Sequence, residues 1–169
     1  PVNVHPSLLP DLRGAAPVQW ALLHGYRKTG VTTQFMAREM DAGDILALQE
    51  VPIAPDETAR ELKPRLIQAG ATLLVDLLPK FERGEVTAMP QDAARITRAP
   101  KIKKEDGLVS LDAPASENWN KYRAYADSIG TYFYKDSKRM KITLAENARG
   151  EFRVIRVIPE GKRETEYKP

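Results

Sequence analysis

The chain contains no cysteine among its 169 residues and only two histidines, His5 and His24. The absence of cysteine excludes disulfides, thiolate nucleophiles and cysteine-ligated zinc or iron–sulfur sites, and it fits a reducing compartment. Two histidines are too few for a histidine-rich metal site, so we expect no metal. The sequence also lacks a run of about 18 apolar residues, the length that a membrane-spanning helix needs, so we expect no membrane partner.

What the chain does contain is a globular composition. Hydrophobic residues make up 42% of the sequence and charged residues 29%, with 10 glycines and 13 prolines. None of these values reaches the excess that marks collagen or disorder. A length of 169 residues allows one domain of ordinary size or two small ones.

The net charge of +3 is unevenly distributed. Residues 1–88 carry nine Lys and Arg against eleven Asp and Glu, whereas residues 89–169 carry seventeen against twelve. The segment from Arg95 to Lys104 holds five basic residues and no acid. It has no helical period, which is typical of an exposed connector. This connector is either a solvated linker without a function of its own or a contact for a polyanion, because clustered Lys and Arg neutralise phosphates.

The first half of the chain combines strand-like and helix-like segments. Alternating and β-rich patterns predict strands at residues 1–5, 31–36 and 45–53. A proline in first-turn position predicts a short helix at residues 17–24. From residue 56, apolar residues recur at helical spacing, and we expect Gly70 to divide this region into two helices, the second ending at Gly84.

The second half of the chain is richer in strand signals. A short amphipathic helix is predicted at residues 115–127, followed by strands at 131–134, 140–144 and 152–158. We therefore predict three parts: an α/β part over residues 1–88, a basic linker over 89–106 and a small β-rich domain over 107–169.

Three polar residues of the first part have side chains suited to catalysis. Asn3 and His5 lie two positions apart, so in an extended strand both side chains point to the same face. Asp41 lies in a glycine-containing turn between two predicted strands, while Asp44, the competing acid, begins the next strand. An amide donor, an imidazole and a carboxylate, with no cysteine, suit acyl transfer by direct attack of an amine. Their alternative roles are ordinary ones: a loop hydrogen-bonder, a core or capping histidine and a turn former.

The segments around these residues resemble the signature of the folate-dependent formyltransferase family. The resemblance rests on NVHPSLLP at residues 3–10 and RGAAP at 13–17, with further matches at TGVT 29–32, DAGDIL 41–46 and FERG 81–84. APKIKKEDG at 99–107 and RAY at 123–125 resemble the linker and the start of the family's C-terminal domain. A Pro-Trp-Pro-like element that usually follows is replaced here by ADSIG at residues 126–130.

The resemblance implies a fold and an extent. The expected fold is the C-terminal portion of a Rossmann-like formyltransferase domain, followed by a small β-rich domain of OB-like barrel type. Family members carry further strands ahead of the Asn-x-His strand, and this chain begins with Pro1 in place of Met. We therefore expect a C-terminal part of a formyltransferase that does not fold or turn over alone.

The resemblance also implies a reaction. The formyl donor is 10-formyltetrahydrofolate, and the acceptor is the α-amino group of methionyl initiator tRNA. Asn3, His5 and Asp41 correspond to the family's catalytic triad, with Asn3 and His5 stabilising the oxyanion and Asp41 assisting proton transfer. No metal and no covalent intermediate is needed. The expected protein is a cytoplasmic monomer that serves translation initiation.

Two further groups of residues are candidates for substrate contacts. The loop beside the triad is shaped by Ser7, Leu8, Leu9 and Pro10, and Arg13 either meets an acceptor phosphate or forms a salt bridge. The candidate tRNA-binding residues are the clustered bases of the second half, Lys101, Lys103, Lys104, Lys138, Arg139, Lys141, Arg153 and Arg156. For any one of them alone, a solvated charge is the favoured interpretation, and only the cluster favours RNA.

Two alternatives remain open. One is a family member that acts on glycinamide ribonucleotide or on an amino sugar nucleotide, although the basic linker and the β-rich domain have no obvious use on a small acceptor. The other is a non-catalytic RNA-binding fragment that uses the basic residues together with Tyr122, Tyr125, Tyr132 and Tyr134. This second alternative does not explain why the Asn-x-His and Asp-x-Gly motifs occur together.

Overall fold

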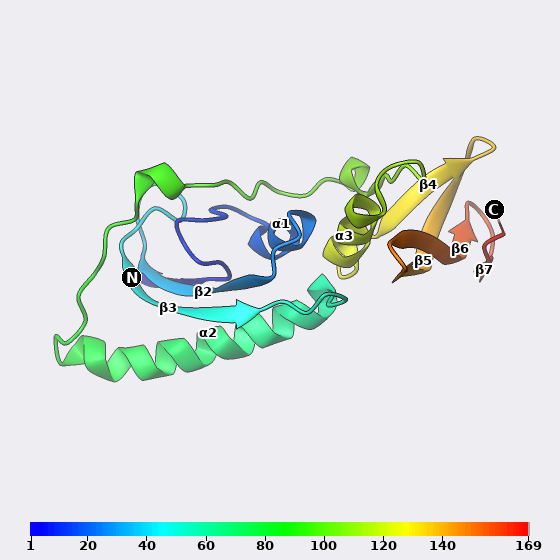
Figure 1. Ribbon diagram of the computed structural model, residues 1–169. Coiled ribbons are helices and arrows are strands. Elements are labelled where there is room, and N and C mark those ends of the chain that lie inside the picture. Colours follow the sequence, from blue (N-terminus) through cyan, green and yellow to red (C-terminus); the bar gives the residue numbers. More distant parts are fainter. Residues whose placement is uncertain (169) are drawn as a thin grey trace.

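The computed structural model describes residues 1–168 and has two parts, each built on its own antiparallel sheet (Figure 1). The sheet of the first part has the order β1-β2-β3, formed by β1 (Val2–His5), β2 (Lys28–Phe35) and β3 (Ile45–Pro52). All three predicted strands of this half are thereby confirmed. The short helix α1 (Pro17–Leu23) begins at the predicted proline, whose fixed φ suits the first helical turn.

A single helix, α2 (Ala59–Glu82), covers one face of this sheet. The expected division into two helices at Gly70 is wrong, because one glycine inside a helix costs only about 1 kcal/mol relative to alanine. Gly70 instead marks a close approach to the sheet: a Cβ atom there would lie 2.8 Å from Val4 Cγ1. The glycine therefore lets the helix pass directly over β1.

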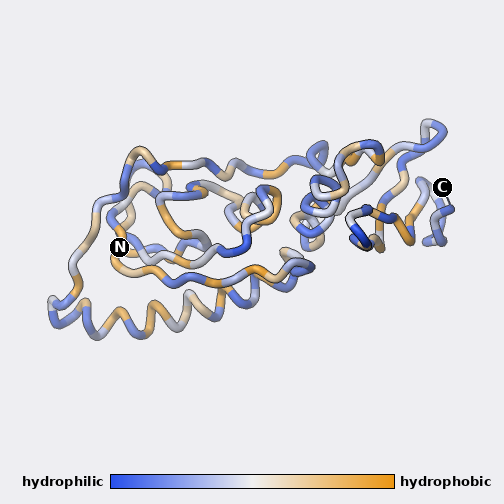
Figure 2. The backbone as a smooth tube through the Cα atoms, viewed as in Figure 1, coloured by the Kyte–Doolittle hydropathy of each residue, from blue (hydrophilic) through white to orange (hydrophobic). Residues whose placement is uncertain are grey.

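The core of the first part lies between the sheet, α1 and α2. Leu22, Val31 and Leu62 are fully buried in it. Along α2, hydrophobic and hydrophilic residues alternate at helical spacing (Figure 2), and the inward positions include Leu62, Leu66 and Gly70. This apolar stripe packs the helix on the sheet, while Ile67, Val75 and Leu78 lie exposed among the polar residues on its other sides.

The second part is a four-stranded sheet of order β4-β5-β6-β7. Its strands are β4 (Thr131–Lys135), β5 (Lys138–Ala148), β6 (Glu151–Pro159) and the unpredicted β7 (Thr165–Glu166). Both residues of each tight turn, 136–137 and 149–150, have positive φ, which is the turn geometry that matches the twist of a hairpin. The predicted fold class, an α/β part followed by a small β-rich part, is confirmed.

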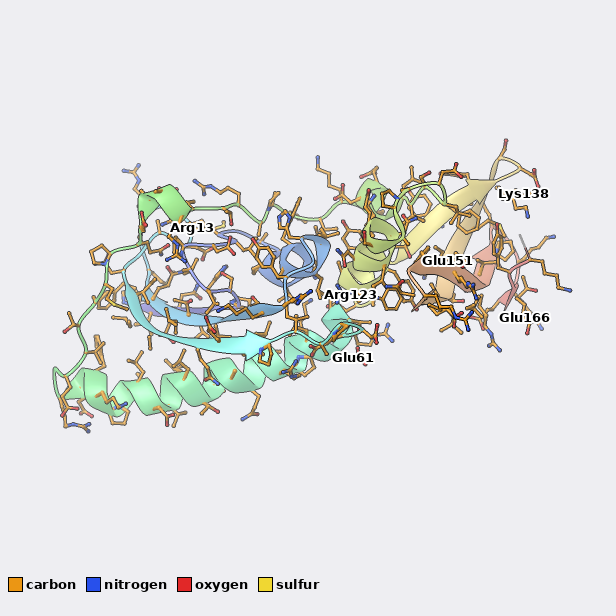
Figure 3. The ribbon with its side chains drawn as sticks, in the orientation of Figure 1. Arg13, Glu61, Arg123, Lys138, Glu151 and Glu166 are labelled. Atoms are coloured by element: carbon orange, nitrogen blue, oxygen red, sulfur yellow. The ribbon has the colours of Figure 1, made fainter. Side chains whose placement is uncertain are left out.

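Helix α3 (Ala115–Tyr125) joins the two parts. Ala124 and Tyr125 belong to the first core, whereas Tyr122 packs against the second. Arg123 is 5% exposed and donates from Nη1 to the carbonyl oxygen of Glu57, 3.2 Å away, at the start of α2. Figure 3 labels Arg123 at the junction of the two parts. The helix therefore ties the second part to the N-terminal end of α2.

The connector between α2 and α3 is packed rather than free. It contains two 3-10 turns, Ala93–Arg95 and Lys104–Gly107. Its backbone pairs with the loop after β1, since Arg13 N donates to Thr97 O at 3.0 Å and Ala99 N donates to Arg13 O at 2.7 Å. Its basic side chains are exposed. Within residues 1–168, none of the helices has the length and apolar character needed to cross a bilayer.

Candidate active site

The face of the first sheet opposite α2 carries the polar residues that the sequence singled out. Asn3 pairs with Gln34 and His5 with Thr32 in the β1–β2 register, so these four side chains share one face. The loop over residues 6–16 and the connector run along this side of the sheet (Figure 1). His5, Thr32 and Gln34 are 4%, 0% and 2% exposed, so this face is a shielded polar layer.

The structure brings His5 and Asp41 together. His5 Nδ1 lies 3.5 Å from Asp41 Oδ1, and His5 Nε2 lies 3.0 Å from the carbonyl oxygen of Leu12. Both ring nitrogens therefore face oxygen acceptors. A doubly protonated imidazole satisfies both contacts, whereas a neutral ring can donate to only one of them.

Asp41 is held in an unusual backbone conformation with its carboxylate turned inward. Its φ is +56°, in the left-handed region that costs most residues about 1–2 kcal/mol. Its Oδ2 accepts a hydrogen bond from Gly14 N at 2.9 Å, and its Oδ1 accepts one from Gln34 Nε2 at 3.2 Å. Asp44, the competing acid, is exposed. Asp41 is therefore the carboxylate that reaches the histidine.

Asn3 lies on the same face of β1 as His5 and is half-buried. Among the contacts of residues 1–168, the Asn3 side chain forms no hydrogen bond, unlike its neighbours His5 and Gln34. Its amide is therefore free to donate to a ligand that approaches this face. The three predicted residues thus share one face, and two of them are in contact.

The predicted substrate-loop residues build the loop itself. Ser7 Oγ donates to Asp11 O at 2.6 Å, and the Ser7 carbonyl accepts from Thr32 Oγ1 at 2.7 Å. Leu9 and Pro10 are buried and Leu8 is half-buried. These residues fix the loop against β2, since each contact joins loop backbone to the sheet or to the loop itself.

Arg13 is buried inside the protein. It is 5% exposed and donates from Nε and Nη2 to Gln91 Oε1 at 3.0 and 2.8 Å. Its Nη1 lies 3.9 Å from Glu39 Oε1. The guanidinium therefore binds side chains of the protein itself, and one of these, Gln91, also contacts Asp41. Figure 3 shows Arg13 on the connector side of the sheet.

Two glutamines of this site have no signal in the sequence. Gln34 and Gln91 contact each other, with Gln91 Nε2 lying 3.2 Å from Gln34 Oε1. Gln91 lies in the connector, whose sequence has no helical or strand periodicity from which side-chain contacts could be predicted. Gln34 lies inside a strand, and only the pairing of β1 with β2 places it beside Asn3.

The predicted tRNA-binding residues are all exposed. They lie in the connector (Lys101, Lys103, Lys104), on β5 (Lys138, Arg139, Lys141) and on β6 (Arg153, Arg156). Lys138 extends from the start of β5 at the far end of the second sheet (Figure 3). Two of the eight are paired with acids, since Arg153 contacts Glu151 at 2.6 Å and Arg156 contacts Glu164 at 3.5 Å.

Arg139 and Lys141 lie beside two tyrosines on the outer face of β4 and β5. Tyr134 pairs with Arg139 and Tyr132 with Lys141 in the register of these strands. The Arg139 guanidinium lies 5.6 Å from the centre of the Tyr132 ring, a cation–π contact. Basic side chains next to aromatic rings are the usual elements of a surface that binds nucleic acid. Tyr125, by contrast, is 3% exposed and belongs to the first core.

Comparison with known proteins gives matches over both parts. Residues 1–78 match the model of the formyl transferase family, and residues 101–162 match that of the formyl transferase C-terminal domain. The methionyl-tRNA formyltransferase of Synechococcus sp. (strain JA-2-3B'a(2-13)) is 48% identical over 141 residues, which cover 83% of this chain and 43% of that protein. The chain therefore spans less than half the length of this curated relative.

Solved structures show the same fold. HypX from Aquifex aeolicus in complex with tetrahydrofolic acid aligns with a TM-score of 0.75 at 19% identity, covering 98% of this chain and 33% of HypX. Methionyl-tRNA formyltransferase from Clostridium thermocellum aligns with a TM-score of 0.69 at 19% identity, covering 98% of this chain and 69% of that one.

Both parts of the chain thus match one class of protein, the first part its formyl transferase domain and the second part its C-terminal domain. The chain belongs to the formyl transferase family.

Proposed function

We propose that the full-length protein carrying this sequence transfers the formyl group of 10-formyltetrahydrofolate to the α-amino group of methionyl initiator tRNA in the cytoplasm. The observation that carries the proposal is the contact of Asp41 with His5 beside the unpaired amide of Asn3. An amide, an imidazole and a carboxylate on one face suit direct attack of an amine on a formyl carbon.

Each of the three residues has a role in the transfer. The amine nitrogen forms a bond to the formyl carbon, and an oxyanion develops on the formyl oxygen. Asn3 and protonated His5 donate hydrogen bonds to this oxyanion; removing one such donor typically costs about a hundred- to a thousand-fold in rate. Asp41 orients His5 and assists the amine proton toward the folate nitrogen, whose bond to the formyl carbon breaks as the carbonyl re-forms.

His5 must change one contact to take this role. Its Nε2 is bound to Leu12 O at 3.0 Å, while Nδ1 faces Asp41. The formyl oxygen replaces Leu12 O as the acceptor of Nε2, so the loop around Leu12 moves or the ring turns when substrate binds. Leu12 has a φ of +59°, a strained conformation of the kind found at functional sites.

The tRNA lies along the exposed lysine and arginine side chains of the connector and of the second sheet. Lys101, Lys103 and Lys104 precede α3, and Arg139 and Lys141 flank two tyrosine rings. Phosphates neutralise the basic side chains and release counterions, while unstacked bases can stack on the rings. The basic character of this half supports a tRNA acceptor over a small one.

The deciding experiment measures transfer of labelled formyl by the full-length protein to methionyl-tRNA and, separately, to glycinamide ribonucleotide and an amino sugar nucleotide. We expect transfer to methionyl-tRNA that falls at least about a hundred-fold in His5→Ala. His24→Ala replaces the other histidine, which is exposed at the end of α1, and should stay within about twofold of the parent.

The other outcomes separate the alternatives. Transfer only to a small acceptor keeps the family and overturns the tRNA assignment. If the protein transfers formyl to no acceptor but still binds tRNA in a salt-dependent way, the result supports the alternative of a non-catalytic RNA-binding protein. Equal losses in His5→Ala and His24→Ala would remove His5 from the mechanism.

A further inference from the structure

Gln91 connects three segments of the chain that meet at Asp41. Its Nε2 donates to the carbonyl oxygens of Asp41 at 2.8 Å and of Gly43 at 2.7 Å. Its Oε1 accepts from Arg13 Nε and Nη2 at 3.0 and 2.8 Å. The side chain of one connector residue therefore bonds the Asp41 turn to the loop after β1.

These contacts close a ring around the Asp41 carboxylate. Gly14, the residue after Arg13, donates its N–H to Asp41 Oδ2 at 2.9 Å. Asp41 is thus held at its carbonyl by Gln91 and at its carboxylate by Gly14, and both holders are joined through Arg13. The other carboxylate oxygen is the one that faces His5.

Asp41 needs such support because of its own backbone. Aspartate adopts a φ of +56° more readily than most non-glycine residues, but the conformation remains uncommon, and hydrogen bonds from the surroundings stabilise it. The hydrogen bonds of Gln91 act on the two carbonyls that flank the bend, so they favour this conformation over a relaxed turn. A relaxed turn would aim the carboxylate away from the imidazole.

The chemistry of these contacts fits a neutral amide. The amide oxygen accepts from a guanidinium while the amide nitrogen donates to two carbonyls. A carboxylate at this position could accept from Arg13 but could not donate to Asp41 O or Gly43 O. An asparagine is one methylene shorter and cannot span the same gap between the two segments.

We propose that Gln91 is a positioning residue of the active site, which fixes Asp41 against His5 without touching substrate. This inference rests on the proposed function and adds a residue to its site. Arg13 shares the role, since it orients the Gln91 amide.

The test uses the full-length protein and Gln91→Glu, with Gln68→Glu on the exposed side of α2 as the matched control for the added charge. We expect kcat of Gln91→Glu to fall about 10- to 100-fold while both KM values stay close to those of the parent, because misplacement of a catalytic group acts on the chemical step. Gln68→Glu should leave kcat unchanged.

A double mutant separates positioning from general damage. If Gln91 acts through Asp41, Gln91→Glu adds little to the loss already caused by Asp41→Asn, since effects of residues that act as one unit are not additive. Multiplying losses overturn the proposal. Amide hydrogen exchange gives a readout apart from activity: the Gly14 N–H should exchange faster in Gln91→Glu.

Gln91→Asn keeps the experiment decisive if Gln91→Glu does not fold, and it should show the same pattern, because it loses the same hydrogen bonds to Asp41 O and Gly43 O. A parent enzyme that transfers no formyl group overturns the proposed function. A parent that is active and loses activity in Asp41→Asn, but not in Gln91→Glu, overturns only the role of Gln91.

Discussion

The Nδ1 atom of His5 lies 3.5 Å from Oδ1 of Asp41, although one residue ends β1 and the other lies in the turn between β2 and β3. In the register of β1 with β2, His5 lies opposite Thr32, three residues before the end of β2. The left-handed backbone of Asp41 then turns its carboxylate back over the same face. The contact depends on both features, and neither segment would produce it alone.

Replacing Asp41 by Asn should impair catalysis without unfolding the protein. The amide keeps the shape of the side chain and an oxygen for Gly14 N, but it removes the charge that faces His5. General acid–base assistance of this kind is worth about a hundred- to ten-thousand-fold, so we expect a loss in kcat of that order in steady-state formyl transfer. Asp44→Asn, at an exposed acid three residues on, is the control. Equal effects of the two substitutions would contradict the assignment.

The outer face of β5 should contribute directly to the salt dependence of tRNA binding. Lys141 is exposed beside Tyr132, and Lys141→Ala should lower the slope of log K against log salt concentration by about one. Arg153→Ala should lower it less, because Glu151 Oε2 already accepts from Arg153 Nε and Nη2 at 3.0 and 2.6 Å. Titration of full-length protein with tRNA at several salt concentrations measures both. A slope unchanged in Lys141→Ala would remove β5 from the tRNA surface.

Substitution of Gly70 should destabilise the first part although alanine is the better helix former. Gly70→Ala gains about 1 kcal/mol of helix propensity, but its Cβ would meet Val4 Cγ1 at 2.8 Å, and overpacking typically costs about 1–3 kcal/mol. We expect the free energy of unfolding of the full-length protein, measured in urea, to fall. Ala71→Gly at the exposed neighbouring position measures the propensity term alone. A more stable Gly70→Ala protein would mean that the helix does not lie this close to β1.

The stability of the protein should fall at alkaline pH through Tyr125. Burial, with a smaller contribution from the charge of Asp106, raises the pKa of Tyr125 from 10.0 to about 12. The folded state therefore favours the neutral phenol, so the contribution to stability is complete below about pH 10 and is lost as the pH rises toward 12. Unfolding in urea between about pH 9 and 11 should show this loss in the parent.

The same experiment on two variants identifies the residue responsible. Tyr125→Phe has no phenol to ionise, so the part of the alkaline loss that depends on Tyr125 should disappear. Tyr134→Phe removes a tyrosine that is 58% exposed and should behave like the parent. Identical pH dependence in all three proteins would show that Tyr125 is not buried as described.

Local patterns in the sequence were enough to predict most elements and part of the site. Strand alternation and the proline of α1 depend on backbone preferences that act within a few residues, so β1 to β6, α1 and α3 follow from them. The two-residue period of a strand is also sufficient to place Asn3 and His5 on one face. The family signature adds Asp41 to them.

Other features depend on contacts between segments far apart in the sequence. Gly70 lies inside α2, where the missing Cβ leaves room for Val4 beneath the helix. Gln34 and Gln91 meet only after β2 and the connector have packed together. The pairing of β6 with β5 leaves Ile155 without a partner, and this bulge lets Arg153 and Arg156 both face outward despite their odd spacing.

The sequence by its periodicity and motifs determines which residues are helical, which are extended and which carry the chemistry. The tertiary structure decides how these residues are held: Asp41 by Gln91 and Gly14, Arg13 inside the protein, and α3 between the two cores. The physical reason is range. Propensity and alternation act between neighbours, whereas hydrogen bonds between side chains and distant backbone groups form only when the whole chain has packed.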